Sequence, residues 1–397
     1  MGAGTVTSPK GFQAGGVYAG IKEKGKDIAL LVSESPAQVA GVFTTNRVPA
    51  HCVVYNKERV AQGTARALVV NSGNANCCTG EQGRLDTLEM ARYTATSLGI
   101  PQEQVLVLST GVIGERLPMD KIRSGIDQAA NALSPEGGRD AAEAILTTDT
   151  VAKYGSIPFD IHGKECCIGV MAKGSGMIHP NLATMFCIFT TDVAIDSSLL
   201  KEAFFEVMDD SFNVLTVDGE MSTNDTALIL ANGAAGNRTI VEKNNAYTNF
   251  VTALRELAIE ATKAIARDGE GATKLVTVEV SGAATTDDAI RAGKSIANSM
   301  LVKTALFGND PNWGRIVQAA GASGADINPD RFAVHCAGIR VAENGGQRMF
   351  DEIEMRRRLK QPEVTIGIDL GVGDKSAVVY TCDLSYDYVR INAEYHT

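Results

Sequence analysis

Strand-like and helix-like segments follow one another irregularly along the 397 residues, and this order limits the fold more than any other feature of the sequence. Short runs of β-branched and aliphatic residues predict strands at residues 28–32, 53–55, 67–70, 105–108, 166–171, 185–195, 227–230, 275–280, 332–335, 364–368 and 377–382. Apolar residues at helical spacing predict helices at residues 84–98, 198–209, 245–266 and 287–300, with Asp196 or Ser197 as the N-cap of the second. Because strands and helices do not alternate strictly, the pattern favours a layered α/β sandwich over a doubly wound parallel sheet.

The composition is that of an ordinary globular protein, with 44% hydrophobic and 21% charged residues. The 40 glycines indicate many tight turns, which suits a turn-rich α/β enzyme. A formal net charge of −10 argues against a nucleic-acid-binding function, since such binding needs a basic surface that displaces counterions. The dense basic run at residues 356–358 follows acidic residues and predicts the solvated face of a helix.

The sequence also gives no indication of a membrane protein, a secreted protein or a metal-binding protein. The chain has no run of 18 apolar residues that could span a bilayer, and its first residues lack the charged start and apolar core of a secretory signal. The eight cysteines are scattered and include no C-x-x-C pair, so we expect free thiols rather than a disulfide framework or a zinc site. We therefore expect a cytoplasmic protein with no metal.

The sequence changes character abruptly at Ala183–Thr184, where a glycine-rich polar loop (GSGMIHPNLA, 174–183) meets an apolar run. Thr184 by itself is explained as a β-branched residue that begins a strand. It is also a candidate nucleophile, because the free amine of an N-terminal threonine can act as the base that activates its hydroxyl. In the intact chain that amine is part of the peptide bond to Ala183, so the catalytic interpretation requires cleavage there.

Other nucleophile arrangements are absent from the sequence. There is no G-x-S-x-G elbow, and the five histidines have no spacing that suggests a triad. The segment LSTGVIG (108–114) follows a predicted strand and precedes a predicted helix, so its backbone N–H groups are candidate donors to an oxyanion. Gly111 permits close approach there and the Thr110 hydroxyl is a second candidate donor, although an ordinary glycine-rich turn explains the same pattern.

Three further polar clusters have both a structural and a functional interpretation. The amides of residues 71–76 and the polar stretch 211–225 are explained by default as buried turn groups that satisfy backbone atoms. In the loop at 268–271, a carboxylate after a predicted helix is typical of a C-cap region, and Glu270 is also a candidate for binding a substrate amine.

Taken together, these segments closely resemble the ornithine acetyltransferase family, glutamate N-acetyltransferases with an N-terminal nucleophile. The matching segments span nearly the whole chain in order: TTNRVPA (44–50), NSGNANCCTG (71–80), STGVIGERLPMDKI (109–122), GSGMIHPNLATM (174–185), SFNVLTVDGEMSTNDT (211–226), ARDGEGATK (266–274), LVKTALFGNDPNWGRI (301–316) and INAEYHT (391–397). A set of this length is far more specific than any single motif.

The resemblance implies a reaction. Thr184 attacks the carbonyl of Ala183 and cuts the chain into an alpha chain, 1–183, and a beta chain, 184–397, after which its free amine serves as the base. Thr184 then takes the acetyl group from N-acetylornithine, releasing ornithine, and glutamate attacks the acetyl-enzyme to give N-acetylglutamate. No cofactor is implied, and some members of the family also accept acetyl-CoA as donor.

The resemblance also implies residue roles and an architecture. Thr110 and Gly111 would form the oxyanion hole. Substrate contacts would come from Thr150, Lys173, Thr184, Glu270, Asn392 and Thr397. The implied fold is an αββα-type sandwich with a smaller C-terminal α/β region at about residues 282–397, assembled as a heterotetramer of two alpha and two beta chains.

Two other functions compete with this interpretation. One is a self-cleaving aminopeptidase of related fold, which would act on peptide amides and not on N-acetylornithine. The other is an uncleaved metabolite-binding protein, which would remain one polypeptide and bind an amino acid without turnover. The second leaves the Ala183–Thr184 junction without a role.

The implied substrate contact of Thr397, the last residue, gives a first testable expectation, because chain ends usually fray unless they are held in place. Extending the chain beyond Thr397 with a short flexible tag is expected to lower kcat/KM by about tenfold or more, the loss of one good contact. Steady-state kinetics of tagged and untagged protein measure this, and an N-terminal tag is the control. Unchanged kinetics with the C-terminal tag would remove Thr397 from the site.

Overall fold

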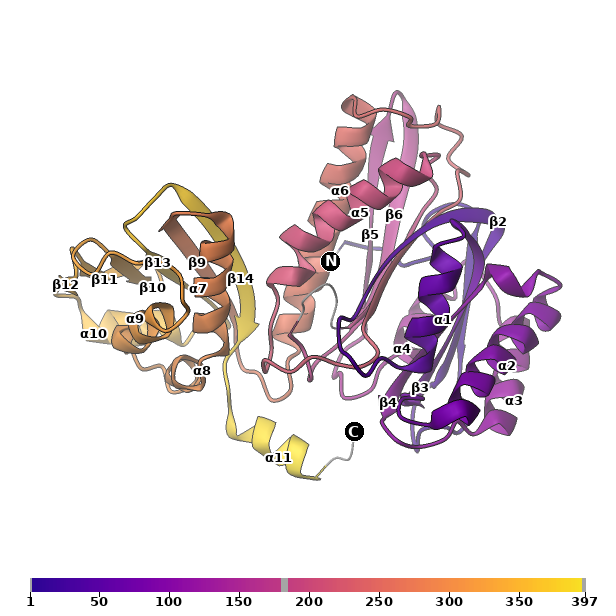
Figure 1. Cartoon of the computed structure of the whole chain (residues 1–397), viewed down its shortest axis with the longest axis horizontal. Helices are drawn as coiled ribbons and strands as arrows, with labels where there is room; N and C mark the ends of the chain where they lie inside the picture. The colour runs from indigo at the N-terminus through magenta and orange to yellow at the C-terminus, as the bar shows by residue number, and fades with distance from the viewer. Residues whose placement is uncertain (1, 180–184, 395–397) are drawn as a thin grey trace.

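The computed structural model describes residues 2–179 and 185–394, and they form a large and a small α/β unit (Figure 1). The large unit contains an eight-stranded sheet in the order β4-β3-β2-β8-β7-β6-β5, with β1 paired to β2. Its strands are β1 (Phe12–Val17), β2 (Ile28–Phe43), β3 (Thr64–Asn74), β4 (Val105–Val112), β5 (Lys153–Ile161), β6 (Lys164–Lys173), β7 (Phe186–Thr191) and β8 (Thr226–Ala231).

The long strand β2 divides this sheet into two halves. Its first part, 28–33, pairs with β1 and β3, and its last part, 38–43, pairs with β8; pairing with β3 also resumes at Ala37 and Gln38. The register with β3 shifts between Val32 and Ala37, and Pro36 lies within that interval, where a proline is tolerated because ladder pairing is interrupted. One strand therefore belongs to both halves and turns the sheet from one into the other.

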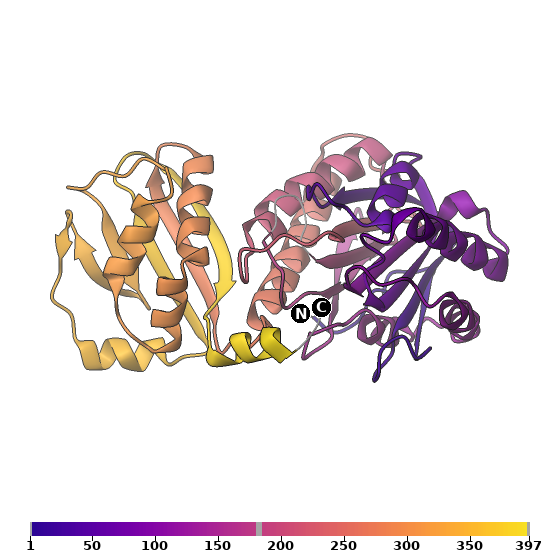
Figure 2. The same ribbon diagram turned by 60° about the horizontal axis from the view of Figure 1, so that its bottom comes forward.

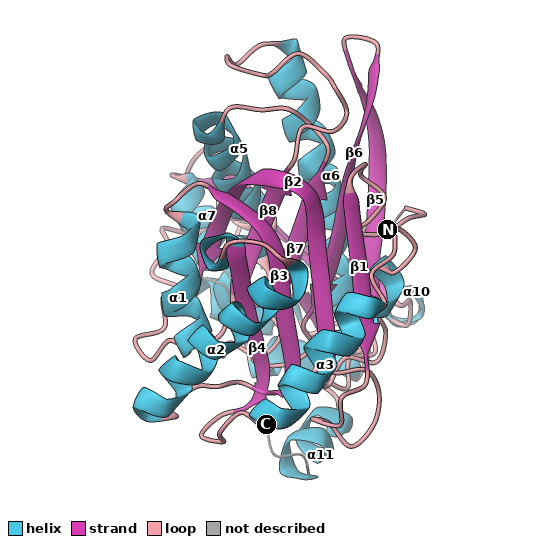
Figure 3. Cartoon of the chain, turned by 90° about the vertical axis from the view of Figure 1, so that its right-hand side faces the viewer, coloured by secondary structure: helices cyan, strands magenta, loops and turns pink. Residues whose placement is uncertain are grey.

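The two halves face each other across an apolar core. Alternate residues such as Leu31 and Leu68 in one half pack in the same cluster as Ile188 and Leu228 in the other. The opposite face of the first half packs against α1 (His51–Val60), α2 (Gly80–Leu98) and α3 (Met119–Asn131), which lie in front of the strands in Figure 3. The opposite face of the second half packs against α5 (Ser197–Asp210) and α6 (Asn245–Arg267). This is the predicted αββα sandwich, and the prediction is confirmed; the short α4 (Gly138–Ala144) completes the inner core.

The small unit is built on a six-stranded sheet in the order β12-β11-β10-β13-β9-β14. Its strands are β9 (Leu275–Ala283), β10 (Ala333–Cys336), β11 (Ile339–Glu343), β12 (Gly346–Gln347), β13 (Glu363–Asp369) and β14 (Lys375–Cys382), and its helices are α7 (Thr286–Asn298), α8 (Met300–Phe307), α9 (Trp313–Gly321) and α10 (Glu352–Leu359). The sheet begins at Leu275, ahead of the boundary expected at about residue 282. After β14, α11 (Tyr386–Glu394) extends toward the large unit (Figures 1 and 2).

Most predicted elements are present, but two predictions need correction: the type of the element at residues 53–55 and the end of the helix at 287–300. Residues 53–55 were expected to form a strand but lie inside α1, because the burial of Val53 and Tyr55 against β4 stabilises a helix that β-branched residues disfavour locally. The helix expected at 287–300 ends at Asn298, because Ser299 caps a new helix through Val302 N. Asp196 is the N-cap of α5, and its carboxylate accepts a hydrogen bond from Ser198 N at 2.9 Å.

Two further observations concern membranes and thiols. None of the helices in the described part of the chain combines the length and apolarity that crossing a bilayer requires. All eight cysteines are free thiols, as expected.

The free edge of the first half-sheet is closed by a side chain from α1. Strand β4 is the last strand of the sheet, and the buried Asn56 side chain pairs with both backbone groups of Val107: Nδ2 donates to the carbonyl at 2.7 Å and Oδ1 accepts from the N–H at 3.0 Å. Asn56 thus replaces a neighbouring strand and fixes β4, whose end carries Thr110 and Gly111.

Substituting Asn56→Ala should therefore lower the free energy of unfolding by about 1–3 kcal/mol, the cost of leaving buried backbone groups without partners. Denaturant unfolding monitored by circular dichroism measures this. Asn131→Ala, at an exposed position at the end of α3, is the matched control and should leave the midpoint unchanged. Equal midpoints for the two variants would show that Asn56 does not stabilise the edge.

Candidate active site

A cavity at one end of the sandwich collects most of the predicted site residues. It is lined by residues 110–111, 147–148, 176–178, 185–186 and 222–225, together with Ala75, Ile113, Lys173, Glu270 and Asn392. Thr110, Gly111, Lys173, Glu270 and Asn392 are thus brought together from distant segments of the chain. Ala183, Thr184 and Thr397 lie outside the described residues, although Met185, the next residue after Thr184, lines the cavity.

The candidate oxyanion donors lie at the carboxyl end of β4, beside the end of β3. The two strands are parallel, and Gly111 is paired with Gly73. Gly111 has φ +133°, and a Cβ atom there would lie 2.2 Å from the backbone carbon of Gly73, so no residue with a side chain fits. Only glycine lets this strand end approach its neighbour so closely, and this places the Gly111 backbone in the cavity wall.

Amide side chains hold this wall, as the default interpretation of the two polar clusters predicts. Asn224 Nδ2 donates to the backbone carbonyls of Ala75 at 2.7 Å and Ser109 at 2.6 Å, which ties the turn after β3 to the end of β4. Asn74 Nδ2 donates to the carbonyls of Glu115 and Arg116 at 3.2 and 3.0 Å. The amides therefore satisfy buried backbone acceptors around Thr110 and make the strand ends rigid.

Lys173 supplies positive charge to the cavity from the end of β6. Its Nζ donates to Thr147 Oγ1 at 3.1 Å and lies 5.8 Å from the centre of the Phe186 ring. Burial lowers the pKa of Lys173, and the carboxylates of Asp149, Asp225 and Glu270 only partly oppose this effect. An ammonium in this position can bind a substrate carboxylate.

Glu270 and Asn392 form a pair in the cavity wall. Asn392 Nδ2 donates to Glu270 Oε2 at 2.7 Å, which connects α11 to the loop after α6. A Cβ atom on Gly176 would lie 2.4 Å from the Glu270 carboxyl carbon, so glycine at this position lets the carboxyl reach the cavity. Asp268 is the C-cap of α6, whereas the Glu270 carboxyl lines the cavity, where it can face a substrate amine.

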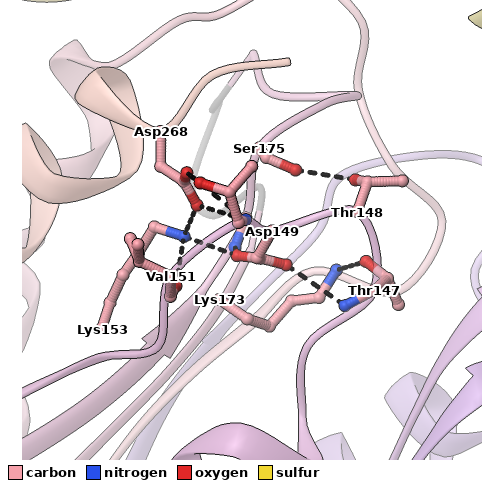
Figure 4. Close-up of polar contacts among 10 residues, drawn as sticks. Thr147, Thr148, Asp149, Val151, Lys153, Lys173, Ser175 and Asp268 are labelled. Atoms are coloured by element: carbon pink, nitrogen blue, oxygen red, sulfur yellow. Dashed lines mark hydrogen bonds and ion pairs between the residues drawn. The ribbon is translucent and has the colours of Figure 1, made fainter. Parts of the chain in front are cut away.

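A buried ionic network holds the segments that carry these groups (Figure 4). Lys153 Nζ lies 2.6 Å from Asp149 Oδ1 and 2.5 Å from Asp268 Oδ2, and all three side chains are almost completely buried. Asp149 Oδ1 also accepts from Gly174 N at 2.7 Å. Burial raises the pKa of Asp149, but Lys153 and Lys173 outweigh it and the net effect is a lowered pKa. The network connects the start of β5, the end of β6 and the loop after α6.

Thr150 belongs to this network rather than to the cavity wall. Its hydroxyl and its backbone N–H both donate to the Asp268 carboxylate. Among the described residues Thr150 does not line the cavity, so its predicted contact with substrate has no direct counterpart in this geometry.

Four acidic or basic residues of the site were not singled out from the sequence: Asp149, Lys153, Asp218 and Asp225. Asp218 accepts from the backbone N–H groups of Met177 and Ile178 at 2.6 and 2.9 Å, shortly before the Ala183–Thr184 junction. Asp225 lines the cavity at the start of β8, and burial raises its pKa well above the ordinary carboxyl value. Lys153 and Asp225 lie at the starts of β5 and β8, where a charged residue next to an apolar strand was the available signal, whereas Asp149 and Asp218 lie in loops and gave none. In the described residues, no group of three or more His, Cys, Asp or Glu side chains could hold a metal ion.

Comparison with known proteins assigns the chain to a family. The model of the ArgJ family matches residues 13–397. The arginine biosynthesis bifunctional protein ArgJ of Symbiobacterium thermophilum is 52% identical to this chain, and the match covers 100% of this chain and 99% of that protein. The chain belongs to the ArgJ family. This confirms the resemblance found in the sequence.

Other members of the ArgJ family give the same result. The bifunctional protein ArgJ of Caldanaerobacter subterraneus subsp. tengcongensis is 48% identical, and the match covers 99% of each chain. The crystal structure of ArgJ from Bacillus halodurans is 41% identical with a TM-score of 0.51, and it covers 53% of this chain and 98% of the solved chain.

Removing the Lys153 ammonium should test the importance of the ionic network. Lys153→Met leaves two buried carboxylates without their cation, so the free energy of unfolding is expected to fall by about 3–5 kcal/mol. The pKa of Asp149 is lowered in the folded wild type. The ionised carboxylate therefore contributes to the free energy of unfolding at neutral pH, and this contribution is lost as pH falls through the folded-state pKa. The difference in free energy of unfolding between the wild type and Lys153→Met should therefore shrink below about pH 4.

The matched control for Lys153→Met is Arg84→Met, which removes a cation from the exposed pair with Glu81. Denaturant unfolding at pH 7 should show no measurable change for this variant. A Lys153→Met protein as stable as the wild type would show that the network does not hold the site together.

Proposed function

We propose that the chain is a self-processing acyltransferase that moves the acetyl group of N-acetylornithine to glutamate through an ester on Thr184. The observation that carries this proposal is the convergence of Thr110, Gly111, Lys173, Glu270 and Asn392 on one cavity, which Met185 also lines. The name of the relatives, an arginine biosynthesis bifunctional protein, supports a place in that pathway.

The first step is activation of the nucleophile by cleavage. The Thr184 hydroxyl attacks the carbonyl of Ala183, and the acyl group shifts from nitrogen to oxygen, which breaks the peptide bond and frees the Thr184 amine. Water then hydrolyses the ester, which releases the Ala183 carboxylate and restores the Thr184 hydroxyl. The hydrogen bonds from Met177 and Ile178 to Asp218 hold the chain before the junction. The solved ArgJ chain from Bacillus halodurans matches 53% of this chain, a share similar to residues 184–397, which are 214 of the 397 residues. This agreement in size supports cleavage.

The acetyl transfer then has two steps that use the same site: N-acetylornithine acetylates Thr184, and glutamate removes the acetyl group. The Thr184 amine takes the proton of its own hydroxyl while the oxygen attacks the acetyl carbonyl, and Thr110 and Gly111 stabilise the oxyanion. The carbon–nitrogen bond breaks, and ornithine leaves with the proton. Glutamate attacks the acetyl ester through its amine, and the reverse proton movements release N-acetylglutamate. In this proposal Lys173 binds the α-carboxylate of each substrate, and Glu270 binds the side-chain ammonium of ornithine.

Several finer features belong to the same proposal. The mature enzyme is a heterotetramer of two 1–183 and two 184–397 chains, works in the cytoplasm and needs no cofactor. Acetyl-CoA is an alternative acetyl donor, which the word bifunctional in the relatives' name supports. An assay with acetyl-CoA and glutamate, in the absence of N-acetylornithine, tests the second activity.

The decisive experiment is the intact mass of the purified protein. The wild type should give two fragments of 183 and 214 residues, whereas Thr184→Ala should remain one chain of 397 residues. Transfer of acetyl from N-acetylornithine to glutamate should fall at least about 10³-fold in Thr184→Ala, because the nucleophile and the base are both lost. Thr96→Ala, at an exposed position in α2, is the matched control and should be cleaved and active.

Each contrary result supports a different function. A single uncleaved wild-type chain that binds an amino acid without turnover would identify a metabolite-binding protein. Cleavage with hydrolysis of peptide amides, and no acetyl transfer, would identify an aminopeptidase.

A further inference from the structure

The dipeptide Cys-Cys occurs twice in the chain, at residues 77–78 and 166–167, and the two pairs have opposite geometries. Cys166 and Cys167 lie in β6, where successive side chains point to opposite faces of the sheet. Their sulfurs donate weak hydrogen bonds to different carbonyls, those of Lys164 and Ile168. The pair in β6 therefore does not present two sulfurs to one ligand.

The sulfurs of Cys77 and Cys78, in contrast, lie 3.7 Å apart in the turn between β3 and α2. Cys78 has φ +58°, in the left-handed region that a residue with a side chain rarely adopts, and this conformation turns its sulfur toward that of Cys77. The Asn76 side chain holds the turn, since Nδ2 donates to the carbonyl of Gly83 and Oδ1 accepts from Thr79 Oγ1, both at 2.8 Å. The two sulfurs are thus brought together by a fixed backbone.

The spacing suits two bonds to one central atom better than a bond between the sulfurs. Neighbouring Cα atoms are about 3.8 Å apart, below the range of about 4.4–6.8 Å that disulfides usually span, so the pair favours the dithiol. Two sulfurs bound at about 2.3 Å to a tetrahedral centre lie about 3.75 Å apart. The observed 3.7 Å matches this value, so the pair is preorganised to bind one thiophilic atom through both sulfurs.

The surroundings decide which thiophilic atom fits. Among residues 2–179 and 185–394, no group of three or more His, Cys, Asp or Glu side chains could hold a metal ion, whereas a zinc ion needs about four ligands. A trivalent arsenic atom that carries one carbon substituent needs only two further bonds and prefers sulfur for both. An organic arsenical therefore matches a site that offers two sulfurs.

One sulfur gives access and the other gives retention. Cys78 is exposed, so a reagent in solution reaches its sulfur first. Cys77 is buried, and its sulfur makes only a weak contact with the carbonyl of Val48 at 3.6 Å. Because the second bond, to Cys77, forms within one molecule, it is strongly favoured once the first exists.

We propose that Cys77 and Cys78 form a two-sulfur site for trivalent organic arsenicals, outside the substrate cavity. With an arsenoxide, R–As=O, each sulfur forms one bond to arsenic, the arsenic–oxygen bonds break, and the two thiol protons leave with the oxygen as water. Arsenic remains trivalent, so the step needs no oxidant or reductant. Capture at this site does not depend on the proposed function.

The backbone joins this site to the cavity. Ala75, which lines the cavity, donates from its N–H to the carbonyl of Val112 at the end of β4. The carbonyl of Cys77 accepts from Gly114 N, and both hydrogen bonds are 2.9 Å long. A ring that contains arsenic shifts this turn and, through these bonds, the end of β4. Occupation should therefore lower acetyl transfer, and this second effect rests on the proposed function.

The test treats the full-length protein, reduced with a monothiol, with an equimolar amount of phenylarsine oxide and measures its intact mass. The wild type should gain one phenylarsenic group, whereas Cys78→Ser should gain none. The matched control is Cys167→Ser, which removes one thiol of the other pair and should capture the reagent as the wild type does. Dithiothreitol should remove the group and 2-mercaptoethanol should not, because two bonds to one protein exchange readily only with another dithiol.

Activity is measured on the same samples. Acetyl transfer by the modified wild type should fall about tenfold or more and recover with dithiothreitol, the cost of a displaced strand end. Cys78→Ser is a change at an exposed position, so this variant should have wild-type activity, and the reagent should not alter it.

Several results would contradict the inference. A wild type without the added group, or a Cys78→Ser protein that gains it equally, would overturn the site. Loss of capture in Cys167→Ser would also overturn it, because the reagent would then bind in β6. Full capture with unchanged acetyl transfer would overturn the effect on the cavity. An untreated wild type without acetyl transfer would contradict the proposed function alone, since the mass measurement does not use activity.

Discussion

The Lys153 ammonium, held between the buried carboxylates of Asp149 and Asp268, connects segments that lie far apart in the sequence. Asp149 fixes the turn after β6 through Gly174 N, and Asp268 fixes the loop that carries Glu270. Lys173 and Glu270 therefore keep their positions only while the network is intact. A buried charge triad of this kind adds little net stability, but removal of one member leaves uncompensated buried charge and is strongly destabilising. The side of the cavity that Lys173 and Glu270 line depends on it.

The opposite side of the cavity depends on hydrogen bonds and close packing instead. Asn56 closes the edge of β4, Asn224 joins the ends of β3 and β4, and Gly111 permits their approach. The bend in β2 brings this half-sheet against the other, so the candidate oxyanion donors face the strand that begins after Thr184. Rigid strand ends suit a site that must hold a developing charge without reorganisation.

In the proposed function, the cavity would serve a group that the intact chain does not contain. Thr110, Gly111, Lys173 and Glu270 would serve a nucleophile whose base appears only when the peptide bond before it is cut.

The sequence by itself determined the family, the layered sandwich and five residues of the cavity wall, because motifs as long as STGVIGERLPMDKI carry their chemistry in a fixed order. It also located the α5 cap at Asp196, since capping is a local interaction. Only the tertiary structure decided that residues 53–55 are helical, that the strand predicted at 275–280 belongs to the sheet of the small unit, and that Asp149, Lys153 and Asp225 lie in or next to the cavity. The physical reason is that burial and ion pairing join residues as far apart as Lys153 and Asp268, separated by 115 positions, which no local pattern records.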